Sequence, residues 1–287
     1  MDGGDDDPPS SEDGLDTDRE LTVPAALLWT LAALFVMMSA LVVTQLMRPN
    51  RGEDIVNLQV CFTLGLAVAI YGIARVHLPT RTPGDLLGFR PVQPVLLVIA
   101  ALTGGLMLIP ASWVSGVIET YWPRPEAEVA ARAAFYDLSS TFHKAVFATI
   151  AVAVGPVVED LFFRGALFRD LRRSSGSWMT VTVTAAAFAL VHLDPRMLPI
   201  AFLGGVVLGY LRDATGSVVT STVAHVAYNG AITFGILSGA VKDDAHAQVS
   251  HLVGVGGTAG MVFLLALAGV LSSRSEVTRA AREEDAR

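Results

Sequence analysis

Eight long apolar stretches dominate this sequence and constrain its fold more than any other feature. A membrane-spanning α-helix needs about 20 apolar residues to cross a hydrocarbon core of about 30 Å. Inside a bilayer every backbone polar group must be paired within the protein, which favours helices. The sequence therefore predicts an all-α fold, a polytopic transmembrane bundle of about eight helices. The expected spans are Val23–Leu46, Ile55–Val76, Pro94–Ile118, Phe142–Arg173, Ser177–Leu193, Leu198–Leu211, Ser217–Leu237 and Leu252–Ser272.

The composition agrees with lipid as the main solvent. Hydrophobic residues make up 52% of the chain and charged residues 16%, whereas soluble domains average about 25% charged. The fourth to seventh stretches are shorter or carry polar residues, which core helices tolerate when neighbours shield them. The single cysteine, Cys61, excludes an internal disulfide and a cysteine-based zinc cluster.

Short polar tails flank the apolar region. Residues 1–22 are acidic and poor in apolar side chains, so we expect a disordered tail there. This tail lacks the basic segment of a cleavable signal peptide, so the first apolar stretch is expected to remain as a helix. Residues 23–272 are then the transmembrane domain, and residues 273–287 a cytoplasmic C-terminal tail. No nucleic-acid partner is expected.

Basic residues outside the spans predict the orientation. With eight spans, the side that holds both termini carries twelve basic residues and the other side carries seven. Because cytoplasmic loops are enriched in Lys and Arg, both termini are expected to be cytoplasmic. The chain would then be a multi-pass protein of the cell membrane. Residues 126–138 are amphipathic, which fits either a helix lying on the membrane surface or an ordinary connecting helix.

Three of the middle spans carry ionisable or polar side chains that would be costly in lipid. Such residues are functional by default when they occur inside a membrane. The segments are VVEDLFFRG with Glu159, Asp160 and Arg164, FALVH with Phe188 and His192, and HVAYN with His225 and Asn229.

The spacing of these residues predicts which of them meet. Asp160 and Arg164 are four residues apart and can pair on one helix face, which leaves Glu159 about 100° away without a partner on its own helix. Glu159 and His192 each lie about 21 Å from the tight turn between their helices, at 1.5 Å per residue. His225 and Asn229 lie about 12 and 18 Å from the same side. One layer can therefore hold all four groups.

These groups suit hydrolysis of an amide bond. A carboxylate beside a neutral imidazole can hold a water molecule and take its proton, which is general-base catalysis. A histidine and an asparagine one turn apart can offer N–H donors to a developing oxyanion. The sequence therefore predicts an intramembrane endopeptidase that acts on a peptide or a membrane-anchored protein.

The order E-[ED]-x3-R, F-x3-H and H-x3-N on successive membrane helices resembles the CAAX protease and bacteriocin-processing family (CPBP, or Abi) of intramembrane glutamic endopeptidases. The family includes the type II CAAX prenyl endopeptidases, and the resemblance covers residues 142–237. It implies that Glu159 is the general base, that His192 helps to bind the water, and that His225 and Asn229 stabilise the oxyanion. Arg164 and Phe188 match supporting motif residues. One position departs from the motif, since Asp160 replaces its second glutamate.

Other functions remain open at this point. Glu159, His192 and His225 could form a zinc shell with a free position for water, although we expect no cofactor. A non-catalytic scaffold or a proton-coupled transporter would also place such residues in a membrane. Neither the substrate nor its prenylation can be inferred from the sequence. His77, His143, His246 and His251 are assigned no role.

Overall fold

The computed structural model describes residues 18–48, 55–135, 138, 140–239 and 250–285, with side chains from 132–135 and 274–285 left undescribed. Within these ranges the regular structure is helical, which confirms the predicted all-α class. The elements are α1 (Val23–Met47), α2 (Ile55–Val76), α3 (Pro83–Leu87), α4 (Pro94–Tyr121), α5 (Glu126–Phe135), α6 (Thr141–Thr149), η1 (Ile150–Val154), α7 (Gly155–Asp160), η2 (Leu161–Ala166), α8 (Phe168–Ser175), α9 (Ser177–Leu190), α10 (Leu198–Thr215), α11 (Val218–Leu237) and α12 (His251–Asp285).

Six helical segments in the described part are long and apolar enough to cross a membrane. They are α1, α2, α4, the run Thr141–Ser175, α10 and residues His251–Ser273 of α12. The other two predicted spans correspond to α9 and α11, which are not among the six. Helix α9 is apolar but has only 14 residues, and α11 carries the polar side chains of His225 and Asn229. The polytopic bundle is therefore confirmed, whereas the count of eight spans stays a prediction.

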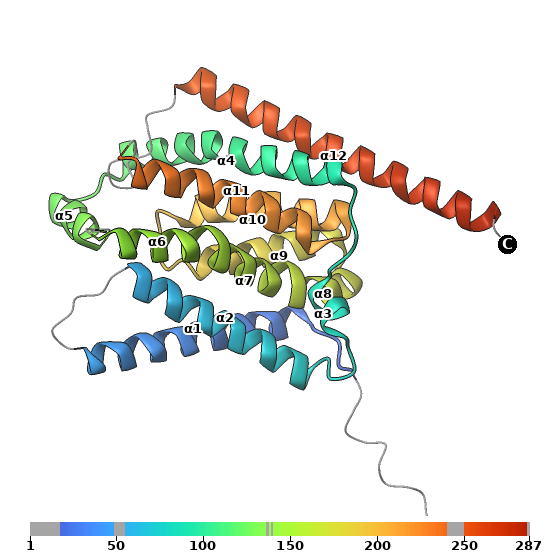
Figure 1. Cartoon of the computed structure of the whole chain (residues 1–287), viewed down its shortest axis with the longest axis horizontal. Coiled ribbons are helices and arrows are strands. Elements are labelled where there is room, and N and C mark those ends of the chain that lie inside the picture. The colour runs from blue at the N-terminus through green and yellow to red at the C-terminus, as the bar shows by residue number, and fades with distance from the viewer. Residues whose placement is uncertain (1–17, 49–54, 136–137, 139, 240–249, 286–287) are drawn as a thin grey trace, which may run out of the picture.

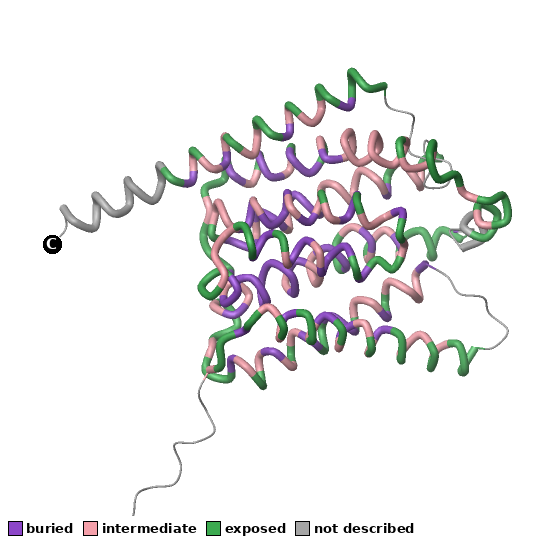
Figure 2. The backbone as a smooth tube through the Cα atoms, turned by 180° about the vertical axis from the view of Figure 1, so that it is seen from behind, coloured by how far each residue is buried: buried purple, intermediate pink, exposed green. Residues whose placement is uncertain are grey.

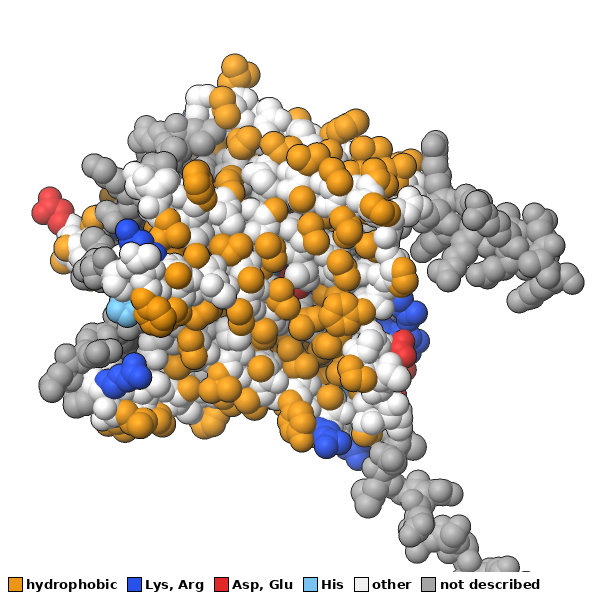
Figure 3. All heavy atoms as spheres, viewed as in Figure 1, with side chains coloured by type: hydrophobic (Ala, Val, Ile, Leu, Met, Phe, Trp, Pro, Cys, Tyr) orange, Lys and Arg blue, Asp and Glu red, His pale blue; other side chains and the backbone are white. Residues whose placement is uncertain are grey.

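The helices form a bundle whose middle contains the most buried residues (Figures 1 and 2). The α1–α2 pair lies on one side of the run α6–α11, and α4 with α12 lies on the other (Figure 1). Figure 3 shows hydrophobic side chains spread over the whole of this face, and most of the coloured charged groups lie towards its two ends. Exposed residues such as Leu28 and Phe35 on α1 fit a lipid-facing surface.

Salt bridges close one end of the bundle, which we call the arginine-rich end. Arg81 pairs with Asp18 and Asp170, Arg169 pairs with Asp85, and Arg172 pairs with Asp213. These pairs join the segment before α1, the α2–α3 connection, α3, α8 and α10. They also hold together the connections on which the basic residues of the predicted cytoplasmic side lie.

Part of the predicted N-terminal tail belongs to this end. Leu21 is fully buried, and Asp18 accepts hydrogen bonds from Thr80 and Arg81. Burial raises the pKa of the Asp18 carboxyl, but these hydrogen bonds outweigh it and lower that pKa below its ordinary value. Ordered contacts therefore begin before α1, while residues 1–17 lie outside the described residues.

Helices α4 and α11 cross at Gly104 with almost no space between their backbones. A Cβ atom built on Gly104 would lie 2.0 Å from the carbonyl oxygen of Ala224, the residue before His225. Because the nearest obstructing atoms all belong to the backbone of Ala224, the two helices would have to separate. The neighbouring Gly105 has no atom within 4 Å of the same position.

We expect Gly104→Ala to lower the free energy of unfolding by about 1–3 kcal/mol, the usual range for an overpacked core. Thermal unfolding of the purified protein in detergent measures the effect. Gly105→Ala is the matched control and should stay within about 0.5 kcal/mol of wild type. Equal stability of the two variants would contradict the close crossing.

Candidate active site

The helical run Thr141–Ser175 contains two widened turns, η1 and η2, on either side of α7. The sequence predicted one membrane span over Phe142–Arg173, and this run is one of the six candidate spans, but its widened turns were not predicted. Pro156 explains η1, since proline has no N–H to donate to the preceding turn. The Gly155 N–H bonds to Ile150 O, five residues back. Wide turns of this kind are frequent at functional sites, and η1 and η2 flank the Glu159–Asp160 pair.

The widened turn at η1 leaves the carbonyl of Ala151 without its usual donor. Its α-helical partner, the Gly155 N–H, is taken by Ile150, and the next residue, Pro156, has none. Asn229 on α11 supplies the missing donor through Nδ2, 3.0 Å from Ala151 O. One N–H of Asn229 therefore joins α11 to η1. The predicted donation to an oxyanion falls to its other N–H and stays a prediction.

Asp160 and Arg164 form the predicted pair, with both side chains fully buried. Arg164 Nη1 lies 3.0 Å from Asp160 Oδ1, and Nη2 donates to the carbonyl of Gly205 on α10 at 3.3 Å. The shorter carboxylate in place of the motif glutamate thus reaches the arginine. The guanidinium also lies 4.5 Å from the centre of the Phe188 ring, so one buried cation joins three helical segments.

His225 lies between the two carboxylates. Its Nδ1 is 3.5 Å from Asp160 Oδ1 and its Nε2 is 3.7 Å from Glu159 Oε2. Asp160 is completely buried, whereas the Glu159 side chain is 12% exposed and lines the cavity described below. The two neighbouring carboxylates therefore have different places: Asp160 lies behind His225, and Glu159 lies at its solvent-accessible side.

His192 lies just beyond α9, which ends at Leu190, so the predicted helix end at Leu193 is three residues too late. Its Nδ1 lies 2.8 Å from Phe188 O. A carbonyl only accepts hydrogen bonds, so Nδ1 is the donor, and in a neutral ring Nε2 is then the acceptor. The Phe188 ring packs edge-on against both His192 and His225. Phe188 therefore spaces the two imidazoles, as a packing residue would.

A cavity of about 660 Å³ brings the site residues together. Glu159, Phe188, His192, His225 and Asn229 all line it. Most of its other walls are apolar side chains from α2, α4, α10, α11 and α12. The convergence predicted from helix depth is thus present in the structure. A mostly apolar cavity with a few converging polar groups is the usual form of a ligand site.

Three lining or neighbouring residues were missed by the sequence analysis. Gln59 on α2 lines the cavity, and its Oε1 is buried without a hydrogen-bond partner in the described part of the chain. Tyr228 lines it next to Asn229. Arg196, just after His192, is buried. A polar side chain within an apolar stretch is the signal that could have identified Gln59.

The described side chains do not fit a metal ion. Glu159, His192 and His225 were the ligands considered for zinc, yet no group of three or more His, Cys, Asp or Glu side chains in the described ranges converges on a metal-binding position. A zinc shell requires donors about 2.0–2.2 Å from one point. We therefore derive no step through a metal.

The central part of the chain matches a known protein family. Residues 141–231, about a third of the sequence, match a family model described as type II CAAX prenyl endopeptidase Rce1-like. The match includes α6 to α10 and the first part of α11, and so every site residue predicted from the sequence. A search of curated proteins and a search of solved structures each found no significant match.

Proposed function

We propose, from the match of residues 141–231 to the Rce1-like model of type II CAAX prenyl endopeptidases, that the protein is a membrane endopeptidase in which Glu159 activates water. The observation that carries the proposal is the position of Glu159 and His192 in one cavity, with His225 behind Glu159. The family supports a protease acting in a membrane, and the glutamate mechanism is our inference.

Glu159 and His192 would hold the attacking water between them. The water donates one proton towards the Glu159 carboxylate and the other towards the free Nε2 of His192. Its oxygen lone pair then faces the peptide carbonyl. Glu159 takes the first proton as the C–O bond forms, and it returns that proton to the leaving amine as the C–N bond breaks. General-base catalysis of this kind contributes about 10²–10⁴ in rate.

His225 is the proposed oxyanion donor. We propose that its Nε2 donates to the oxyanion while its Nδ1 faces the buried carboxylate of Asp160, 3.5 Å away. Arg164 in turn neutralises and orients Asp160. We propose the free N–H of Asn229 as a second donor. The supporting residues thus act through His225 rather than on the water.

The proposed substrate is a peptide or a membrane-anchored protein, with the apolar cavity wall receiving its apolar part. We propose, from the distribution of arginines, that the arginine-rich end and both termini are cytoplasmic. A zinc-dependent peptidase is the alternative mechanism. A non-catalytic scaffold or transporter is the alternative class of function.

We expect cells that produce the protein to gain defined membrane-peptide cleavage products that cells without it lack. Quantitative mass spectrometry of membrane fractions compares the two. A quenched peptide built on the best cleaved sequence should then be cut by purified protein, with activity unchanged by chelators. Stoichiometric zinc that is needed for turnover would instead support the metal-dependent alternative.

A further inference from the structure

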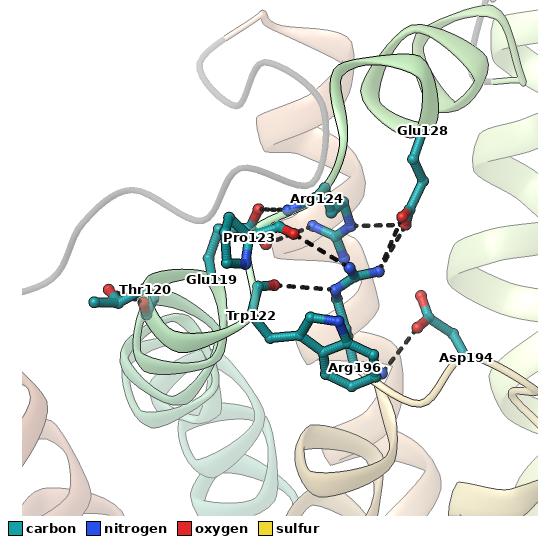
Figure 4. A network of polar contacts seen from close by, with 9 residues as sticks. Glu119, Thr120, Trp122, Pro123, Arg124, Glu128, Asp194 and Arg196 are labelled. Atoms are coloured by element: carbon teal, nitrogen blue, oxygen red, sulfur yellow. Dashed lines mark hydrogen bonds and ion pairs between the residues drawn. The ribbon is translucent and has the colours of Figure 1, made fainter.

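The loop that follows His192 is tied to α4 and α5 by one buried arginine. Arg196 is 9% exposed and donates from Nη1 to both carboxylate oxygens of Glu128 on α5, at 2.8 and 3.1 Å. Its Nε donates to the carbonyl of Trp122 at 3.3 Å, and Nη2 donates to that of Pro123. Figure 4 shows these contacts, which we call the Arg196 clasp.

Every guanidinium nitrogen of Arg196 has a hydrogen-bond acceptor. The guanidinium also stacks on the Trp122 ring, 4.5 Å from its centre. Arg124 also approaches Glu128, with its Nε 3.4 Å from Oε1, and is hydrogen-bonded to Glu119. The three nitrogens of this planar guanidinium bind three different groups, Glu128 from Nη1, Trp122 O from Nε and Pro123 O from Nη2, which fixes its orientation as well as its distance. The segment around residue 196 therefore has one defined position relative to the end of α4.

Between the clasp and His192 the backbone is strained. Leu193 has φ of 55°, and it is the one non-glycine residue with positive φ in the described part of the chain. Such a conformation is unfavourable for a side chain with a Cβ and persists where the surrounding structure imposes it. The Arg196 N–H bonds to Asp194 Oδ1 at 2.9 Å, so the short segment from Leu193 to Arg196 is held as a unit.

We propose that Arg196, with Glu128 and Trp122, positions His192 for catalysis by holding Leu193 in its left-handed conformation. Arg196 is a positioning residue, since its side chain lies on α4 and α5 rather than in the cavity. The proposal rests on the proposed function for its catalytic consequence. Its structural part, that the clasp sets the place of the His192 ring, is independent of that function.

The geometry explains why His192 depends on the clasp. His192 lies two residues beyond the end of α9, where the backbone is held by bonds to the third residue back, from His192 N–H to Ala189 O at 3.2 Å and from Leu193 N–H to Leu190 O at 3.3 Å. Its ring is held by Phe188 O on one side and opens to the cavity on the other. When the clasp is lost, Leu193 can relax to negative φ. This rotation turns the adjoining peptide and moves the imidazole away from Glu159.

The test uses the full chain purified in detergent and the quenched peptide described above. We expect Arg196→Gln to lower kcat about tenfold or more, with KM within twofold, because small misplacements of a catalytic group cost up to about 10² in rate. The kcat of Arg196→Lys should lie between those of wild type and Arg196→Gln, since lysine keeps the charge but has one nitrogen donor in place of three. Arg124→Gln is the matched control, because Arg124 contacts the same Glu128 but not the loop, and it should keep kcat within twofold.

A second readout needs no activity. Diethylpyrocarbonate labelling followed by mass spectrometry measures the reaction rate of His192 against His143, an exposed residue on α6. We expect Arg196→Gln to raise the relative rate at His192 at least threefold, as the ring leaves Phe188. Adding Leu193→Gly should reverse much of this change and of the kcat loss, because glycine adopts positive φ without penalty.

The outcomes separate the two proposals. If Glu159→Gln still cleaves the peptide, the proposed function fails, while the labelling result continues to test the clasp. An unchanged labelling rate in folded Arg196→Gln protein overturns the clasp, whatever kcat does. An unchanged kcat together with altered labelling overturns the catalytic consequence. Melting temperatures confirm that each variant is folded.

Discussion

Glu159→Gln is expected to reduce peptide cleavage at least about 100-fold while leaving the fold intact, in line with the contribution of a general base. The carboxamide has the same shape as the carboxylate but cannot take a proton from water. It can still lie beside His225 Nε2, which is 3.7 Å from Glu159 Oε2 in the wild type. The loss should therefore be in kcat rather than in KM, as steady-state kinetics on the quenched peptide will measure.

Glu20→Gln is the matched control, because Glu20 is exposed and lies before α1. It should retain full activity. The same variant pair separates enzyme from scaffold in cells. A peptidase loses its cleavage products with Glu159→Gln, whereas a scaffold keeps its cellular effect. Full cleavage by a stably folded Glu159→Gln protein would refute the mechanism.

Arg164→Met is expected to destabilise the protein by about 3–5 kcal/mol, the cost of leaving a buried charge without its partner. Arg164 and Asp160 are both completely buried, so water cannot replace the lost cation. Arg164 also donates to Gly205 O and packs on Phe188, and the variant removes these contacts as well. Thermal or denaturant unfolding in detergent measures the change, with the exposed Arg173→Met as control.

The double variant Arg164→Met with Asp160→Asn tests whether the unpaired charge of Asp160 causes the loss of stability. Removing both charges should recover at least half of the lost stability, since buried ion pairs are often replaceable by neutral groups. Cleavage should stay low, because His225 then lacks the carboxylate that faces its Nδ1. If the double variant is as unstable as Arg164→Met, the loss comes from packing and the charge-pair explanation is wrong.

The helical bundle and the set of polar residues were accessible from the sequence. Apolar length predicts membrane helices, and a spacing of four residues predicts which groups share a face, as for Asp160 and Arg164. Counting residues from a shared turn also predicted that Glu159, His192, His225 and Asn229 could meet. These predictions succeed because helix rise and rotation are local and nearly constant.

The tertiary structure decided which atoms each group contacts. Asn229 bonds to Ala151 because a proline removes a donor from a different helix, and no pattern within HVAYN contains that information. His192 lies past the end of α9, next to Leu193 with its positive φ, and Arg196 ties the following loop to Glu128. The partners of Arg196, Trp122 and Glu128, lie 74 and 68 residues away from it along the chain.

The sequence by itself thus determined a polytopic helical membrane protein with a carboxylate, two histidines and an asparagine at one depth, and the motif order that led to a peptidase family. Only the tertiary structure decided that Asp160 lies behind His225 while Glu159 faces the cavity, and that Arg196 ties the loop after His192 to partners far away in the chain. The reason is physical. Periodicity along one helix specifies which residues share a face, whereas the rotation of that face towards its neighbours depends on packing between segments far apart in the chain.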